Sequence, residues 1–472
     1  MSAPRPSTEL LRRLAVEPRV LRQLAAAAPA RYPALFDSAV SGPTGQLSIL
    51  AAQPTAALWL TPDGRLAAAG MEPRGPGFLA ALEHWWRSES LSPAQPAAVP
   101  GPFSPGWVVF LGYELMAEIE PRLVLPRTPL PWAAFALRTP CALVHVLATG
   151  EVWAVGEPGS QSLLETVALD ALRAQDAPEP AFAPGSYTVT EEDPARYIER
   201  VLRAKEYIRA GDIYQANLSR PWWVEPAPDA PGALAPGALY GRLRQRNPAP
   251  FAALVQWQGI TLLSSSPERL IEVRGREVQT RPIAGTRPRT HRPGEDRAEA
   301  AALVAHPKER AEHIMLIDLE RNDLGRVCEA GTVRVDELMV TETYAHVHHI
   351  VSNVRGRLRA EVSPIGAVRA TFPGGTITGV PKFRCMQIIA ELEGEGRGAY
   401  TGSLGYLRVN GDLDLNILIR TMALDGGRIG LRAGGGIVAD SDPERELNET
   451  RAKARGMLAV FEPAASPGGS SA

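Results

Sequence analysis

The segment EHIMLIDLERNDLGR, residues 312–326, places charged and polar side chains in a run that is otherwise typical of buried core. Its acids, bases and amide flank or interrupt four consecutive apolar residues, 314–317. Because burying an unpaired charge is costly, these groups must either pair with one another or face a polar cavity. One such run by itself is more often a salt-bridged helix end. Further segments along the chain favour the polar cavity.

The composition is ordinary for a soluble globular protein, and the length predicts two or three domains. The chain has 472 residues, of which 45% are hydrophobic and 22% charged, and a formal net charge of −2. That length is ample for a large core, and the charge lacks the basic excess typical of nucleic-acid binders. No apolar run approaches the roughly 20 residues that a membrane-spanning helix needs. We therefore expect no nucleic-acid partner and no membrane partner.

The cysteine pattern predicts a reducing compartment. Cys141, Cys328 and Cys385 lie far apart, are odd in number and include no CxxC spacing. A disulfide framework or a zinc site is therefore not expected, and a cytoplasmic location fits.

Composition divides the chain into two regions. Residues 1–175 contain short extended pieces separated by Pro/Gly turns, and residues 174–186 are typical of a linker. Residues 187–462 are denser in strand and helix patterns, and the tail 463–472 is predicted to be disordered. In the second region we predict strands at 251–257, 261–265, 270–273, 400–409, 415–424 and 429–433, and helices at 194–210, 295–305, 381–392 and 443–461.

Two glycine clusters are candidate anion sites. They are FPGGTITG, residues 372–379, and Gly434–Gly436. Turns of this kind expose backbone N–H groups toward an anion, although a tight turn without a ligand is equally consistent with either cluster alone. Neither cluster matches GxxxxGK[ST] or GxGxxG, so a nucleotide phosphate loop is poorly supported.

The last predicted helix carries Glu446, Glu449 and Lys453 at spacings that place all three on one face. A row of surface ion pairs is the commoner meaning of such spacing. The alternative is a hard-metal site, because Mg²⁺ prefers a few carboxylates together with water and substrate oxygens. One carboxylate from Glu449 and another from Glu312 would suit that ion.

Two other residues have both an ordinary and a catalytic interpretation. Glu268 follows a predicted strand and is either a loop carboxylate or a general acid. His349 lies in HVHHIVS, and a lone inward histidine is more often a core residue than a catalyst.

Nine segments carry these residues in a fixed order, and two more extend the set toward the N-terminus. The nine are GDIYQANLSR (211–220), SSSPERL (264–270), RPIAGTRPR (281–289), RAEHIMLIDLERNDLGRVCEAGTV (310–333), HVHHIVSNVRG (346–356), FPGGTITGVPK (372–382), YTGSLGYL (400–407), NILIRT (416–421) and GGGIVADSDPERELNET (434–450), and the two are LFDSAVSGPTGQLSILAAQP (35–54) and LGYE (111–114).

In this order the segments resemble the chorismate-utilising enzymes, a family that includes anthranilate, aminodeoxychorismate, isochorismate and salicylate synthases. The resemblance implies an α+β fold of two large antiparallel β-sheets packed as a sandwich, with helices outside and the active site in a cleft. Residues 1–175 would form part of the sandwich, and residues 187–462 would be the chorismate-binding catalytic region.

The resemblance also implies Mg²⁺ as cofactor. Glu312 and Glu449 would be metal ligands, Glu446 would hold metal-bound water, and Lys453 would support these carboxylates. His349 would line the substrate ring.

The same resemblance assigns the substrate contacts. Arg420 and Tyr400 would meet the enolpyruvyl carboxylate of chorismate. Thr376 and the amides of Gly434, Gly435 and Gly436 would receive the ring carboxylate. Glu268 would lie near the C4 hydroxyl as general acid. Such a set is consistent with a small dianion, which needs cations and backbone donors in a largely dry cleft.

The expected nucleophile is ammonia. Isochorismate and salicylate synthases carry a Lys that activates water, and Gln215 occupies that position here. A neutral amide cannot serve as that base. No cysteine lies in the Gly-flanked context of a glutaminase nucleophile, so a separate glutamine amidotransferase subunit, or free ammonium, would supply the ammonia.

The position of amination has two interpretations. YQANLS, SILAAQP, DLERNDLGRVCEAG and GGTITG resemble aminodeoxychorismate synthase component I, which serves 4-aminobenzoate and folate biosynthesis. Ala284 replaces a Lys that often attacks C2 in those enzymes and instead matches anthranilate synthase component I. We favour aminodeoxychorismate synthase, with anthranilate synthase as the alternative. LFDS, residues 35–38, also resembles the tryptophan-contact segment of the family.

Overall fold

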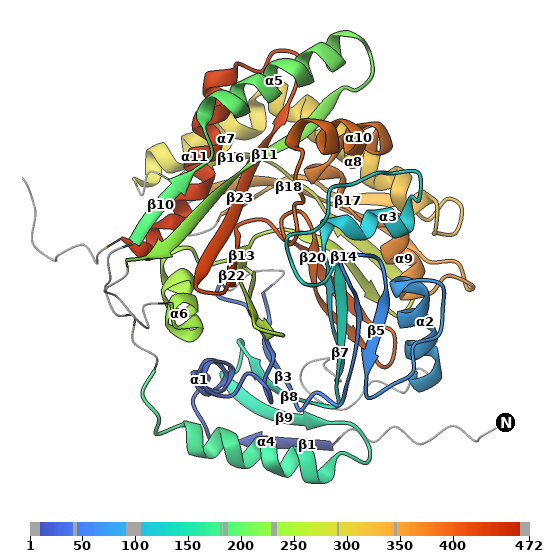
Figure 1. The fold of residues 1–472 in the computed structure, drawn as a ribbon, viewed down its shortest axis with the longest axis vertical. Helices are drawn as coiled ribbons and strands as arrows, with labels where there is room; N and C mark the ends of the chain where they lie inside the picture. Colours follow the sequence, from blue (N-terminus) through green and yellow to red (C-terminus); the bar gives the residue numbers. More distant parts are fainter. Residues whose placement is uncertain are drawn as a thin grey trace, which may run out of the picture.

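Two large antiparallel sheets, packed face to face with helices outside, form the computed structural model (Figure 1). The structure describes residues 10–40, 45–90, 105–179, 182, 187–227, 234–289, 292–343 and 347–462. The α+β sandwich expected from the sequence is confirmed. The predicted tail 463–472 and part of the predicted linker lie outside the described residues.

The first sheet draws its strands from both predicted regions, since β2 pairs with β12. In spatial order its strands are β1 (Leu10–Leu14), β9 (Glu151–Gly156), β8 (Cys141–Val146), β3 (Leu47–Ala52), β2 (Ala34–Asp37), β12 (Phe251–Trp257), β13 (Ile260–Ser266), β22 (Thr421–Asp425), β23 (Arg428–Ile437), β11 (Gln215–Pro226) and β10 (Tyr187–Glu191), and β19 (Gly379–Val380) pairs with β11.

The second sheet is mixed in origin in the same way, since β6 pairs with β20. Its order is β16 (Ile283–Pro288), β18 (Val347–Arg357), β15 (Glu277–Arg281), β14 (Arg269–Arg274), β21 (Leu413–Ile417), β20 (Ser403–Arg408), β6 (Gly106–Leu111), β7 (Ala134–Thr139), β4 (Ala56–Leu60) and β5 (Leu66–Ala69), and β17 (Arg334–Thr343) pairs with β18.

Helices cover the outer faces and one end of the sandwich (Figure 1). The α-helices are α1 (Val20–Ala27), α2 (Phe78–Glu89), α3 (Met116–Ile119), α4 (Gln161–Ala174), α5 (Pro194–Arg209), α6 (Pro236–Arg246), α7 (Pro293–Ala305), α8 (Pro307–Gly325), α9 (Pro364–Thr371), α10 (Lys382–Glu393) and α11 (Pro443–Leu458). The 3₁₀ turns are η1 (Tyr113–Leu115), η2 (Gly375–Ile377) and η3 (Ala459–Phe461). None of these helices, within the described part of the chain, is long and apolar enough to cross a membrane.

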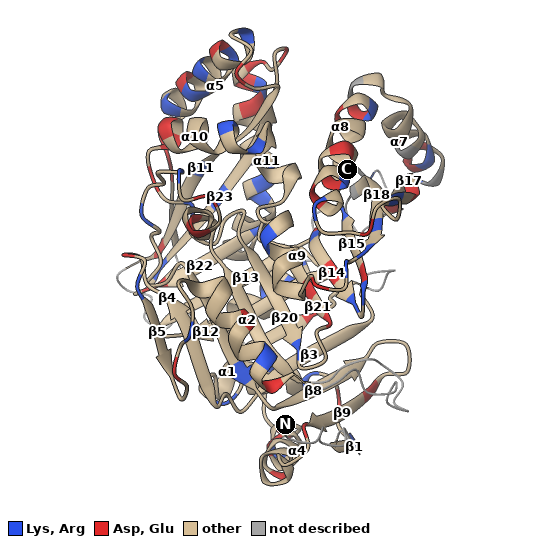
Figure 2. Cartoon of the chain, turned by 90° about the vertical axis from the view of Figure 1, so that its right-hand side faces the viewer, with Lys and Arg blue, Asp and Glu red and all other residues tan. Residues whose placement is uncertain are grey.

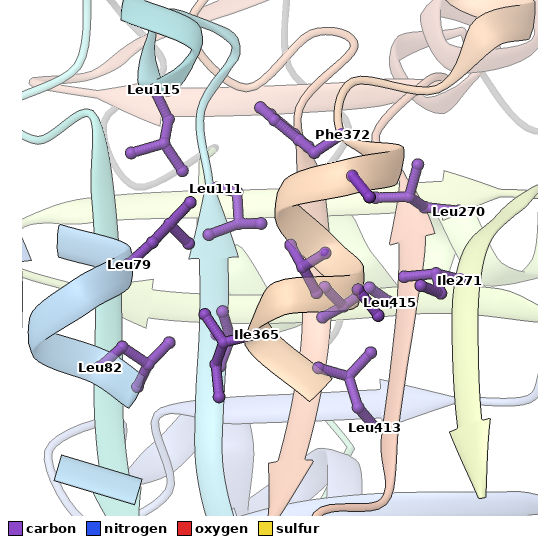
Figure 3. Close-up of a cluster of buried hydrophobic side chains, with 14 of the residues drawn as sticks. Leu79, Leu82, Leu111, Leu115, Leu270, Ile271, Ile365, Phe372, Leu413 and Leu415 are labelled. Atoms are coloured by element: carbon purple, nitrogen blue, oxygen red, sulfur yellow. The ribbon is translucent and has the colours of Figure 1, made fainter. Parts of the chain in front are cut away.

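Apolar side chains hold the layers together. Figure 3 shows Leu79 and Leu82 of α2 and Ile365 of α9 packed with Leu413 and Leu415 of β21 on the outer face of the second sheet. Each of these side chains is almost completely buried. Burial of one such side chain is worth about 1.5–3 kcal/mol, so this cluster fixes α2 and α9 against the sheet.

The strand predicted at 415–424 is wrong, because the chain changes sheets within it. Residues up to Ile417 belong to β21 in the second sheet, and Thr421 begins β22 in the first. Arg420 lies in the crossover and has a φ of 50°. The chain crosses in the same way between β13 and β14, where Glu268 is located.

The interpretation of Gly434–Gly436 as a turn is also wrong. The three glycines lie inside β23 and pair with residues 217–219 of β11. They are needed for close approach, because a Cβ at Gly434 would overlap the carbonyl of Leu218 and one at Gly436 would overlap the Gln215 amide. Pairing of β22 with β23 stops at Leu431, whereas β11 accompanies β23 to Ile437.

Candidate active site

The two crossovers run side by side and bring Glu268 and Arg420 to one end of the sandwich. The Ser265 N–H donates to the Arg420 carbonyl at 3.0 Å, and the Ile417 N–H donates to the Glu268 carbonyl at 3.0 Å. The Ser266 hydroxyl donates to the Ile417 carbonyl at 2.5 Å. These bonds fix two segments that are about 150 residues apart in sequence.

Glu268 has the character of a general acid. Its side chain is only 4% exposed. Burial is the main cause that raises the pKa of Glu268 to about 7, and the nearby Glu320 carboxyl adds to the rise. The neighbouring Thr376 hydroxyl, the Ile283 N–H and the charge of Arg420 oppose it. A carboxyl with such a pKa retains a large protonated fraction at neutral pH and can give that proton to a leaving oxygen.

His349 is a neutral side chain of the same site. It lies in β18 and is 2% exposed. Burial lowers the pKa of His349 to about 3, and the Arg420 guanidinium contributes in the same direction. The imidazole is therefore uncharged at physiological pH. A neutral histidine is suited to lining the ring of a substrate and is not suited to acting as a cationic general acid.

Tyr400 lies just before β20. The sequence predicts that this strand begins at residue 400, but it begins at Ser403. Its hydroxyl faces Gly434, where an added Cβ would lie 2.7 Å from it. Burial raises the pKa of Tyr400 to about 12, so the phenol keeps its proton and can donate a hydrogen bond. The neighbouring Thr401 N–H donates to the carbonyl of Leu418 at 2.8 Å, which ties Tyr400 to the crossover of Arg420.

Arg397 packs against the ring of Tyr400. Its guanidinium lies 5.5 Å from the Tyr400 ring centroid. It forms a fully buried ion pair of 2.6 Å with Glu393 and donates to the Asn217 carbonyl at 2.7 Å. No motif marks this pair in the sequence, although its i,i+4 spacing is typical of an ion pair on one helix face.

The carboxylates of α11 face the glycine strand. A Cβ at Gly435 would lie 3.2 Å from Glu446 Oε2 and 3.6 Å from Glu449 Oε1. Lys453 Nζ lies 2.8 Å from Glu449 and donates to the Gly434 carbonyl at 2.9 Å. The predicted shared face of these three side chains therefore lies against β23.

Glu312 reaches the same strand from another direction. Figure 2 shows the upper helices in two groups. One group is α5, α10 and α11, and the other is α7 and α8. Gln215 of β11 donates from Nε2 to Glu312 Oε1 of α8 at 2.9 Å, which links the two groups. Gln215 also packs against Gly436. Glu312 and the α11 carboxylates thus flank one glycine segment.

The fit of these residues to a divalent cation can be judged from their chemistry. Glu312, Glu446 and Glu449 supply carboxylate oxygens, which hard cations prefer. Because Gly435 has no Cβ, there is space between β23 and the carboxylates of Glu446 and Glu449. Among the described residues, no three His, Cys, Asp or Glu side chains form a ready-made metal-binding group. A cation there would therefore need substrate or water oxygens as well.

A separate cavity of about 320 Å³ lies between the sheets beside the LFDS segment. Asp37 and Ser38 line it together with Arg269 and Asp414, which form an ion pair of 2.9 Å. The segment singled out in the sequence therefore borders a real cavity, distinct from the crossovers.

The family of this chain follows from the comparisons. Residues 40–459 match the family described as chorismate binding enzyme, and the chain belongs to that family. It is similar to anthranilate synthase component 1 of Streptomyces coelicolor (strain ATCC BAA-471 / A3(2) / M145), with 42% identity over 413 residues, 82% of this chain and 78% of that protein.

Two further similarities bear on the specific activity. The aminodeoxychorismate synthase of Streptomyces griseus is 37% identical over an alignment of 480 positions, 95% of this chain and 65% of that protein. The crystal structure of anthranilate synthase component I from Streptococcus pneumoniae TIGR4 matches with a TM-score of 0.76 at 32% identity, covering 89% of this chain and 93% of that chain. The chain is thus a chorismate-utilising enzyme whose relatives carry both names.

Proposed function

We propose that this enzyme aminates chorismate with ammonia to give 4-amino-4-deoxychorismate, a precursor for 4-aminobenzoate and folate. The observation that carries the choice of nucleophile is the Gln215 side chain, which donates to Glu312 at 2.9 Å at the position where water-using relatives have Lys. Its amide has no basic lone pair with which to deprotonate water, whereas ammonia needs no such activation.

Mg²⁺ is the proposed cofactor. Glu312 and Glu449 would hold it, Glu446 would hold a water bound to it, and Lys453, which lies 2.8 Å from Glu449, would support these carboxylates. The ion would supply Lewis-acid stabilisation of the ring carboxylate.

The remaining side chains bind the dianion and handle the proton. Arg420 and the Tyr400 phenol would meet the enolpyruvyl carboxylate, and Thr376 with the backbone amides of Gly434–Gly436 would receive the ring carboxylate. Neutral His349 would line the ring. Glu268 would give its proton to the C4 oxygen as that group leaves.

Anthranilate synthase is the second candidate, and one residue favours it. Ala284, in β16 and 6% exposed, occupies the place of the attacking Lys of many aminodeoxychorismate synthases. With no amine there, ammonia itself would have to attack C2 before nitrogen reaches C4, or the 2-amino isomer would be the product. Four sequence segments favour 4-amination against this single position.

Product analysis tests the choice. With chorismate, Mg²⁺ and ammonium, we expect a product that an added aminodeoxychorismate lyase converts to 4-aminobenzoate. Pyruvate should appear only when that lyase is present, because the proposed reaction leaves the enolpyruvyl group in place. Release of pyruvate together with fluorescent anthranilate by the enzyme alone would establish the second candidate instead. A reaction without ammonium serves as the control for water as nucleophile.

The Ala284→Lys variant tests the position of this residue in the site. We expect its amine to attack C2 and form a covalent adduct with the substrate ring, because amine nucleophiles in apolar surroundings lose their proton readily. Intact-protein mass spectrometry of acid-quenched turnover mixtures detects the added mass. Ala284→Met, similar in length but without an amine, is the matched control. A lysine variant that folds and turns over without an adduct would place residue 284 outside the reacting cleft.

A further inference from the structure

A second buried carboxyl, Glu320, stands beside the acid site. It lies on α8 one turn from Leu316 and from Leu324, which are also buried, and is 5% exposed. The Gly375 N–H donates to Glu320 Oε1 at 3.3 Å. Gly375 begins the 3₁₀ turn η2, whose next residue, Thr376, lies beside Glu268. Consecutive residues of one short turn therefore lie beside the two carboxyls, and the first of them is hydrogen-bonded to Glu320.

Packing alone does not account for an acid at position 320. The cation whose charge acts on Glu320 is Lys382. Its ammonium is engaged by Asp323 and donates to the carbonyls of Thr371 at 3.2 Å and Pro373 at 2.9 Å. In the described part of the chain Glu320 forms no ion pair within 4.0 Å. A buried carboxylate without such a partner costs several kcal/mol, which an apolar residue at this helix position would avoid.

The pKa values of the two carboxyls, Glu320 and Glu268, are both raised, and different neighbouring charges act on each. Burial raises the pKa of Glu320 to about 7; the Asp323 charge adds to the rise, while Lys382, Thr280 and the Gly375 N–H oppose it. Glu268 has a similar pKa, and Glu320 contributes to raising it. Two carboxyls that interact in this way titrate as a pair, and the negative charge of one favours retention of the proton by the other.

We propose that Glu320 is a positioning residue for the reacting proton: as the anionic member of a carboxyl pair beside η2, it keeps the proton on Glu268. This inference rests on the proposed role of Glu268 as general acid. Arg420 is the cation that faces Glu268, and a substrate carboxylate bound to Arg420 would offset its charge. Lys382 remains beside Glu320, so the proton then belongs on Glu268.

The proton balance of the reaction agrees with this role. Glu268 gives its proton to the C4 oxygen, the C4–O bond breaks, and water leaves. The ammonia that forms the new C–N bond loses a proton, which restores the Glu268 carboxyl. Between these events both members of the pair are anionic, and their mutual repulsion favours recovery of the proton.

The test is the pH dependence of chorismate consumption. Total ammonium is adjusted at each pH to keep the concentration of NH₃ constant, since NH₃ also titrates. In the wild type, kcat/KM should fall as the pH rises through about 7, because Glu268 loses its proton there. Glu320→Gln keeps the acceptor for Gly375 but removes the charge, so this fall should move to lower pH by at least ~0.5 unit.

Matched variants separate charge from structure. Glu320→Asp keeps the charge and should restore the wild-type position of the fall. Asp318→Asn makes the same charge change on an exposed part of α8, where Asp318 pairs with Arg321 at 2.9 Å, and should leave the profile unchanged. An unshifted fall in Glu320→Gln, with only a lower rate, would show a structural role and overturn the inference.

An infrared measurement covers the case in which Glu320→Gln is too slow to assay. The C=O band of a protonated buried carboxyl, assigned to Glu268 by its loss in Glu268→Gln, should disappear at lower pH in Glu320→Gln than in the wild type. A band that titrates at the same pH in both would refute the pairing. Full turnover by Glu268→Gln would instead refute the proposed acid itself, which is a separate result.

Discussion

Replacement of Glu449 by Gln is expected to reduce Mg²⁺-dependent chorismate turnover by about two orders of magnitude or more, while the fold survives. The substitution removes one anionic oxygen from the proposed ligand set and leaves an amide, which is a weak ligand for a hard cation. The side chain is about half exposed, and its ion pair with Lys453 is a surface pair worth about 0–1 kcal/mol. Stability should therefore change little.

The measurement is a Mg²⁺ titration of chorismate consumption, accompanied by thermal unfolding. Glu444→Gln is the matched control, since Glu444 lies exposed in the first turn of the same helix. We expect that control to keep the wild-type Mg²⁺ dependence. Wild-type turnover in Glu449→Gln at limiting Mg²⁺ would refute the assignment of this carboxylate to the metal.

Replacement of Glu268 by Gln should lower kcat by about 10²–10⁴-fold, the usual contribution of a positioned general acid. Gln has nearly the same shape, and its carbonyl can still accept from the Ile283 N–H, so the turn should hold. Chorismate binding should persist. The substitution removes a proton donor but leaves Arg420, the cation proposed to bind the substrate, in place. A neutral amide also removes the titration that limits the wild type above pH 7.

Single-turnover kinetics with a separate binding titration distinguish these effects. A loss confined to kcat supports proton donation, whereas a loss confined to affinity would indicate a substrate-positioning role. Glu272→Gln is a suitable control. Glu272 is a buried carboxylate on the following strand that forms an ion pair with Arg274, and it lies outside the crossover.

Much of the fold could be predicted from local patterns. The strand predicted at 251–257 is β12, and the helix predicted from Pro194 begins there under Asp193, whose carboxylate accepts from the Ala195 N–H at 3.0 Å. Helix caps and short apolar runs bounded by turn residues are local signals, and local signals survive without knowledge of the rest of the chain.

The sheet crossover could not be predicted, because its sequence has no break. NILIRTMAL continues an apolar run through residue 420, and an arginine with positive φ has no compositional marker of the kind that glycine provides. The prediction of a turn at the glycines of β23 is wrong for a different reason. Glycine marks both a turn and a close approach of backbones, and only the pairing with β11 decides between them.

The candidate site was partly visible and partly not. Resemblance supplied the positions of Glu268, Glu312 and Glu449, but no pattern could show that Gln215 bonds a residue 97 positions away. Glu320 could have been recognised, because it lies four residues from both Leu316 and Leu324 and so shares their buried helix face.

The paired crossovers also bear on how the chain folds. Hydrogen bonds join Ser265 to Arg420 and Ile417 to Glu268, so neither position is fixed until both sheets have formed and docked. Contacts of such long sequence separation carry a large loop-closure cost and are made late in folding. Recovery of catalysis during refolding should therefore lag behind recovery of secondary structure, which makes enzymatic activity a stricter reporter of the native state than circular dichroism.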